Sequence, residues 1–147
     1  MPEKKTTERA RKDAKEGKAP STQAGEYVRE EMDHIREGKH GARSTKQAIA
    51  IGLSKARRAG VPLKPPKKGQ ASDRTRKQAE RDVRKGSSKS SAKPSAKRSR
   101  ASSQVLKREG RSAASHSALS KQAKSAAARR KRSATKKSTA QKKTSSK

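Results

Sequence analysis

The three histidines are the side chains of this sequence best suited to bind a metal ion. They are His34, His40 and His116, and the first two are six residues apart with Gly38 between them. This spacing corresponds to no common metal-binding motif. The chain also contains no cysteine, which removes thiolate nucleophiles and cysteine-ligated zinc. We therefore expect no metal site and no other cofactor, with His40 a polar side chain in a turn.

A cluster of acidic residues raises the question of acid-base catalysis. Paired carboxylates can do such chemistry in a pocket that excludes water, and a chain with so few large apolar residues is not expected to build one. We expect instead a solvated helix face that pairs with basic residues of the same chain. The abundant serines form no Gly-x-Ser-x-Gly turn, and the glycines form no phosphate-binding loop. The acidic cluster consists of Glu26, Glu30, Glu31, Asp33 and Glu37. Despite this cluster, the sequence predicts a protein that is not an enzyme.

Basic residues dominate the charge of the chain. There are 43 Lys and Arg against 13 Asp and Glu, for a formal net charge of +30. Such an excess attracts polyanions, and each phosphate that is neutralised releases condensed counterions. We expect phosphate contacts made collectively by Lys85, Lys89, Lys93, Lys97, Arg98, Arg100, Lys107, Arg108, Arg111, Lys121, Lys124, Arg129, Arg130, Lys131 and Arg132.

Recognition of particular bases has less support in the sequence. Tyr27 is the single aromatic residue, so no platform exists on which unpaired bases could stack. Contacts with base edges would have to come from a helix over residues 44–59. The candidates on that helix are Lys46, Gln47, Lys55, Arg57 and Arg58.

Composition predicts that most of the chain is disordered. Only 25% of residues are hydrophobic and 1% aromatic, whereas ordering a residue costs roughly 1–2 kcal/mol of backbone entropy that burial has to offset. Residues 1–64 mix both charge signs and hold nearly all the large apolar residues. We divide the remainder into a Pro/Lys linker at 65–71, a polar helix at 72–85 and a disordered Lys/Arg/Ser/Ala tail at 86–147.

Two helices are predicted inside the first part. Ala24, Val28, Met32 and Ile35 share one face of a helix at about 21–37, with Ser21 or Thr22 as its N-cap and Gly38 ending it. Ser44 and Gln47 form a capping-box pair that opens a second helix at about 44–59. Together they predict a small αα-hairpin, which would bury too little to be stable alone, so a homodimer or a protein partner through residues 21–60 would complete it.

Three further stretches have a weaker helical pattern. They lie near residues 6–16, 72–85 and 117–132, and each is expected to be marginal in water because short isolated helices are unstable. The longest apolar run, Ala48 to Ile51, is too short to span a bilayer. With no secretory signal pattern at the start, we expect no membrane association and a cytoplasmic, nucleoid-associated protein.

The stretch from Lys39 to Val61, KHGARSTKQAIAIGLSKARRAGV, resembles a family of small bacterial proteins whose shared segment reads approximately R-x-KQAIAIALS-x-A. The family has Ala where this chain has Gly52, which is expected to loosen the helix. Ala92 to Lys97 is similar to the Lys/Ala/Ser/Pro-rich arms of histone-H1-like bacterial proteins, and that resemblance implies DNA compaction. The first resemblance carries no established activity.

The sequence therefore predicts a nucleic-acid-binding protein that favours DNA over RNA. RNA or ribosome association is the main alternative, because RNA offers the same phosphate charge. A different class of function is an adaptor or plasmid-maintenance partner that docks on another protein through the Ser44–Gly60 helix.

Overall fold

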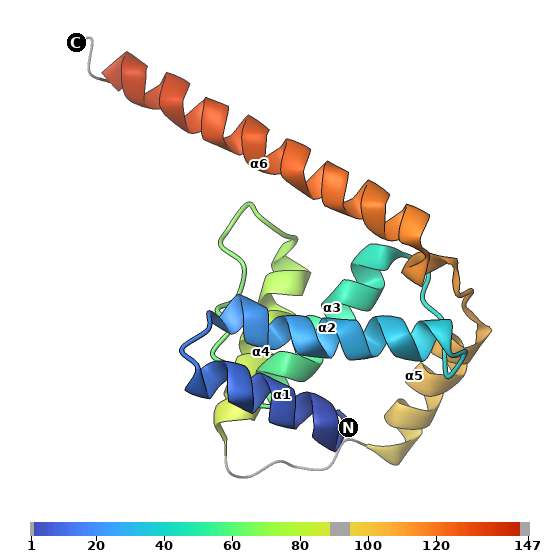
Figure 1. Cartoon of the computed structure of the whole chain (residues 1–147). Coiled ribbons are helices and arrows are strands. Elements are labelled where there is room, and N and C mark those ends of the chain that lie inside the picture. Colours follow the sequence, from blue (N-terminus) through green and yellow to red (C-terminus); the bar gives the residue numbers. More distant parts are fainter. Residues whose placement is uncertain (1, 89–94, 145–147) are drawn as a thin grey trace.

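The computed structural model describes residues 2–88 and 95–144, with side chains described up to residue 135. Its α-helices in chain order are α1 (Lys4–Lys15), α2 (Pro20–Arg36), α3 (Thr45–Arg58), α4 (Asp73–Ser87), α5 (Ala96–Arg108) and α6 (His116–Thr144). A short 3₁₀ turn, η1 (Ser112–Ala114), comes between α5 and α6. The helices form a bundle from which α6 projects (Figure 1).

The prediction that most of the chain is disordered is wrong, because the structure is a helical bundle with 73% helical content. The physical reason is the nature of the core. Most of its buried apolar residues are alanines, and Gly52 lies against the backbone of Val28, so helices pack closely without large side chains. An estimate based on large apolar residues misses burial of this kind.

The two predicted hairpin helices occur close to their expected positions. α2 begins at Pro20 rather than after a Ser21 or Thr22 cap, because proline suits the first helical position and Ala19 serves as the N-cap. Gly38, with φ +77°, follows the last turn as predicted. At α3 the Ser44 hydroxyl accepts a hydrogen bond from the Gln47 amide at 3.2 Å. The Gln47 side chain in turn accepts a hydrogen bond from the Arg43 amide at 2.8 Å, so each of the two side chains accepts from a backbone amide at the start of α3.

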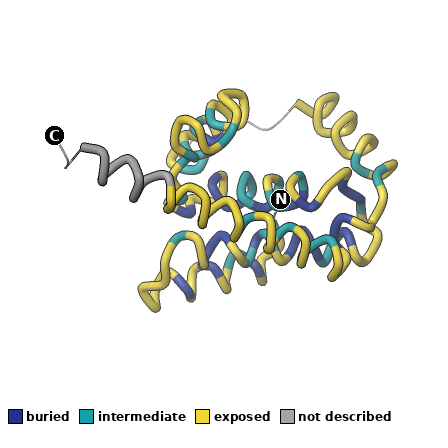
Figure 2. The backbone as a smooth tube through the Cα atoms, turned by 90° about the horizontal axis from the view of Figure 1, so that it is seen from above, coloured by how far each residue is buried: buried dark blue, intermediate teal, exposed yellow. Residues whose placement is uncertain are grey.

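Two apolar clusters fill the space around α2 and α3. One joins Ala10 of α1 to Ala24, Tyr27, Ala56 and Val61. The other joins Met32, Ile35, Ala42 and Ala48 to Ala113 and Ala114 of η1, with Leu119 of α6 packed against it. The buried residues accordingly line the inner sides of the helices (Figure 2).

The weakly predicted helices are stabilised by these contacts. α1 packs on α2, and α4 packs on α3, which explains how two polar helices that would be marginal alone are held in place. α5 was not predicted at all, and α6 is longer than the predicted 117–132. Both fall in the segment that we expected to be a disordered tail, and our division of the chain into domains remains a prediction.

Backbone hydrogen bonds help to tie the tail segment to the hairpin, in addition to the apolar contacts of η1 and α6. The amides of Gly41 and Ala42 donate to the carbonyls of Leu106 and Gly110 at 2.8 and 3.1 Å. A Cβ on Gly41 would collide with the Glu109 carbonyl. This backbone pairing depends on glycine and on main-chain geometry, so side-chain composition gave no sign of it.

Replacing Gly52 with alanine should destabilise the protein. A Cβ there would lie 2.7 Å from the Val28 Cα, so α2 and α3 would have to separate, at a cost of about 1–3 kcal/mol. Urea unfolding monitored by circular dichroism measures the change. Gly25→Ala is the matched control, since no atom lies within 4 Å of its Cβ position, and it should stabilise by about 0.5–1 kcal/mol through helix propensity. A Gly52→Ala protein as stable as Gly25→Ala would contradict the close packing.

Candidate nucleic-acid interface

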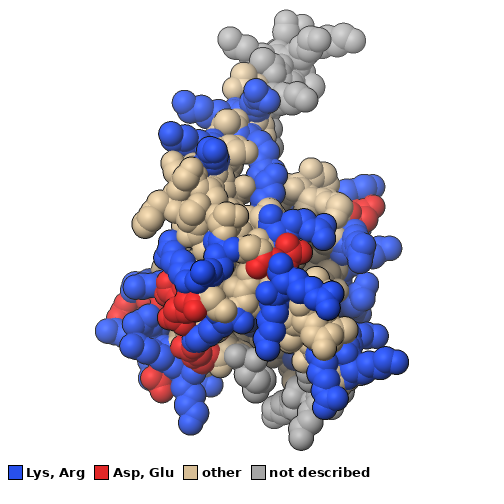
Figure 3. Space-filling model, turned by 90° about the vertical axis from the view of Figure 1, so that its right-hand side faces the viewer, with Lys and Arg blue, Asp and Glu red and all other residues tan. Residues whose placement is uncertain are grey.

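On the face drawn in Figure 3, basic side chains cover much of the surface, and acids lie among them in small groups. Within the bundle the acids pair with bases, as in the contacts of Lys18 with Asp13 and Glu16 at 2.8 Å each. After Glu109 the sequence contains no acidic residue. The positive charge of α6 is therefore uncompensated by acids of the same segment.

Helix α6 carries the largest group of the predicted phosphate-binding residues. Lys121 and Lys124 lie in its first half, and the run from Arg129 to Arg132 lies further along the helix. The side chains of all six residues are exposed. At about 100° per residue, four consecutive bases point to all sides of the helix. The helix is roughly 43 Å long at 1.5 Å per residue, and its distal part extends beyond the bundle (Figure 1).

The other predicted phosphate contacts are spread over several elements. Lys85 is exposed near the end of α4, while α5 holds exposed Lys97, Arg98, Arg100, Lys107 and Arg108. Arg111 is exposed, and its side chain lies over Gly38. Lys89 and Lys93 lie outside the described residues. The described members do not form one compact patch, which fits a collective role better than a single binding pocket.

The five residues of α3 that were predicted to contact bases differ in how far their side chains are available to an external ligand. Lys55 bridges two glutamates of α2, with Nζ at 2.7 Å from Glu31 and 3.3 Å from Glu30. Arg57 is 9% exposed, burial lowers the pKa of its guanidinium, and Nε donates to the Leu63 carbonyl. These contacts give both side chains internal roles.

Arg58, Gln47 and Lys46 complete that set. Arg58 Nε is 3.7 Å from the buried Asp82 carboxylate. Gln47 caps α3 through the Arg43 amide. Lys46 is exposed in the first turn of α3 and lines a groove, so it is the member of the five best placed for an external ligand.

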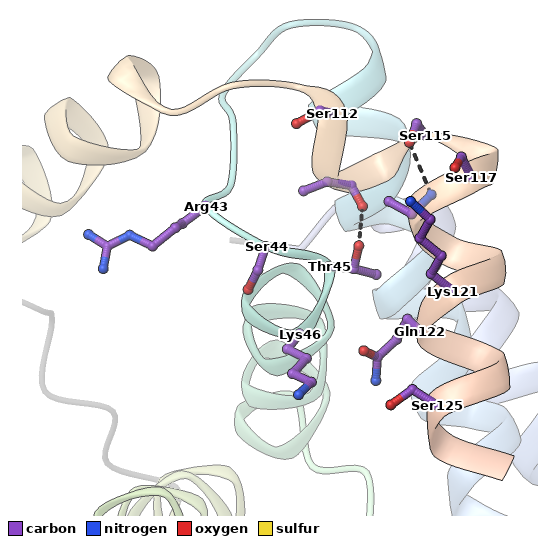
Figure 4. Close-up of a pocket in the computed structure, with 12 residues that line it drawn as sticks. Arg43, Ser44, Thr45, Lys46, Ser112, Ser115, Ser117, Lys121, Gln122 and Ser125 are labelled. Carbon is purple, nitrogen blue, oxygen red and sulfur yellow. Dashed lines mark hydrogen bonds between the residues drawn. The ribbon is translucent and has the colours of Figure 1, made fainter. Parts of the chain in front are cut away.

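That groove lies between the start of α3 and one face of α6 (Figure 4). Its cations are Arg43, Lys46 and Lys121, and no acidic residue lines it. The remaining side chains are small or polar: Ser44, Thr45, Ser112, Ala113, Ser115, Ser117, Ala118, Gln122 and Ser125. Hydroxyls and ammonium groups are the donors that proteins use for phosphate oxygens, so the groove can hold phosphate groups of a polyanion.

Two helix N-termini contribute to this groove. Ser44 caps α3, and the Ser115 hydroxyl accepts from the Ala118 amide at 3.2 Å at the start of α6. The N-terminal turns carry the positive ends of the helix dipoles, which favour anions. Both ends therefore add to the potential created by Lys46 and Lys121.

A buried hydrogen bond fixes the two walls relative to each other. The Thr45 hydroxyl donates to the Ala113 carbonyl at 2.6 Å, and Thr45 is 7% exposed. Sequence reasoning missed Arg43, which precedes the α3 cap, and also Ser112, Ser115 and Ser117, which this packing brings to α3. The signal in the sequence was the serine-rich stretch that precedes a basic segment without acidic residues.

No family model, curated protein or solved structure matches the chain. The resemblances of residues 39–61 and 92–97 therefore stay predictions. Within the described part of the chain, no helix combines the length and the apolar character needed to cross a lipid bilayer.

Replacing Thr45 with valine should loosen the groove. The substitution keeps the shape but leaves the buried Ala113 carbonyl without its donor, which costs about 1–3 kcal/mol. Urea unfolding should show that loss, and hydrogen exchange should rise in residues 112–119. Thr22→Val, at an exposed position, is the control and should change stability by no more than about 0.5 kcal/mol. Equal stability of the two variants would show that this bond does not hold η1 on α3.

Proposed function

We propose that the protein binds nucleic acid through phosphate contacts, with duplex DNA as the favoured ligand and a nucleoid-associated role. The observation that carries the proposal is the projecting α6 helix, whose exposed cations have no acid in their own segment. Apart from Gln122, alanine and serine fill the positions between these cations from Lys121 to Arg132. Such small side chains let a helix come close to a phosphate backbone, and an α-helix fits the DNA major groove.

The preference for a duplex rests on the single aromatic residue. Tyr27 is 1% exposed and lies in the core between α1, α2 and α3, so it cannot stack on an unpaired base. Recognition of single strands usually depends on such stacking, whereas phosphate contacts along a duplex do not. We accordingly expect little dependence on base sequence, and double-stranded RNA is the closest competitor.

The bundle gives this interface a fixed base. Leu119 anchors α6 to the same cluster as Met32 and Ile35, so the first turns of α6 and the groove beside Lys46 have a defined geometry. Phosphates in the groove and along α6 would belong to one continuous backbone. A role for the Ser44–Gly60 helix as a protein-docking element has less support, because α3 packs against α2, α4, η1 and α6.

A charge-matched pair of variants tests the proposal. In the first variant, Arg129, Arg130, Lys131 and Arg132 of α6 are changed to glutamine. In the second, the same number of charges is removed from exposed positions of α1, by changing Lys4, Lys5, Arg11 and Lys15 to glutamine. Glutamine keeps a helix propensity similar to that of Lys and Arg, so both proteins should fold.

Fluorescence anisotropy with unrelated duplex DNAs across about 50–300 mM salt gives the readout. Each phosphate contact contributes about 0.9 to the slope of log affinity against log salt, so the α6 variant should lower the slope by about 3–4. The α1 variant should change it by less than about 1 if these residues make no phosphate contact. Equal losses in both variants would mean that net charge, rather than α6, determines binding. A tighter affinity for structured RNA at each salt concentration would replace DNA as the ligand.

A further inference from the structure

A cluster of possible metal ligands lies where α2 ends and the following loop folds back. Glu31 and His34 are three residues apart on α2, which places them on one helix face. His40 returns to them after the turn at Gly38. One donor atom from each of the three residues lies within 4.8 Å of the other two, and the two imidazole rings are edge to face with centroids 6.0 Å apart.

The Glu31 carboxylate is buried and incompletely neutralised. The residue is 0% exposed, and Oε2 lies 2.7 Å from Lys55 Nζ. The same ammonium also neutralises Glu30, which is 5% exposed. One lysine thus serves two buried carboxylates. Neither carboxylate oxygen of Glu31 has a hydrogen-bond donor in suitable geometry, and His40 Nε2 lies 3.3 Å from Oε1.

The contact of His40 with the backbone shows which ring nitrogen faces Glu31. Nδ1 lies 3.1 Å from the Gly41 carbonyl oxygen, which can only accept. Nε2, the other ring nitrogen, lies 3.3 Å from Glu31 Oε1 without hydrogen-bond geometry to it. A ring that donates from one nitrogen to a backbone carbonyl and offers the other to a metal is the usual form of a metal-binding histidine.

The geometry points to a Zn²⁺ site formed by Glu31, His34 and His40. Three protein ligands leave the fourth position of a tetrahedral ion to water. With metal–ligand distances near 2.0–2.2 Å, tetrahedral donor atoms lie roughly 3.3–3.5 Å apart.

The 3.3 Å separation of Glu31 Oε1 and His40 Nε2 is near that value, and the three donor atoms lie within 4.8 Å of one another, so the side chains would close further on an ion. Lys55 fits the scheme as the partner that holds the other oxygen of Glu31. The His34 and His40 side chains are 14% and 18% exposed, which leaves the ion a route from solvent. Our expectation of no metal site rested on the spacing of the histidines and on a solvated acidic cluster, whereas the structure places the buried Glu31 beside His34 and His40.

The test is a titration of the tag-free full-length protein with Zn²⁺ at pH 7 by calorimetry, together with Co²⁺ absorption in the visible range. We expect one ion per chain and the intense visible bands of tetrahedral cobalt. His40→Ala and Glu31→Gln should each weaken binding by about 100-fold or more, since loss of even an outer-sphere partner typically costs 10–100-fold. His116→Ala, which removes the remaining histidine at the exposed start of α6, should bind as the unaltered protein does.

Far-UV circular dichroism checks the fold of each variant. His34→Ala, at a side chain on the rim of the cluster, provides a second loss of a ligand if His40→Ala does not fold. The proposal is overturned if the unaltered protein binds no zinc. It is equally overturned if His34→Ala binds zinc as tightly as the unaltered protein, or if His116→Ala abolishes binding.

Discussion

The close packing of α3 against α2 is the constraint on which the rest of the structure depends. Gly52 lies so near the Val28 backbone that no side chain fits between them, and Ala48 and Ala56 are fully buried one turn to either side. α3 is thereby placed where α4, η1 and α6 can also contact it. In a chain with little large apolar material, this contact sets the positions of the other elements and gives α6 its base.

Part of this architecture could be predicted from local sequence signals. The capping pair at Ser44 and Gln47, the glycine after α2 and the apolar spacing of α2 act within a few residues, and the structure has helices close to both predicted positions. The prediction that most of the chain is disordered was wrong. Ala113 and Ala114 look like low-complexity sequence, yet both are buried against Met32 and Ile35, and nothing local indicates a partner some eighty residues away.

The same distinction holds for the candidate sites. The excess of basic residues could be read from the sequence, but their division into internal and external roles could not. Lys55 and Arg57 have the charge of a ligand-binding residue and are engaged by Glu31 and the Leu63 carbonyl. Lys46, on the same helix, lines the groove with Lys121. Likewise, His34 and His40 form a candidate metal site only when the folded bundle brings them beside the buried Glu31.

The proposed function requires that nucleic acid contacts the α6 side of the molecule while the bundle serves as its support. A direct measurement is a map of amide chemical-shift changes in ¹⁵N-labelled protein titrated with a short DNA duplex. We expect changes concentrated in residues 43–47 and 112–132, with α1 and the core of α2 unchanged. Changes centred on α1, or spread evenly over all exposed basic segments, would contradict it.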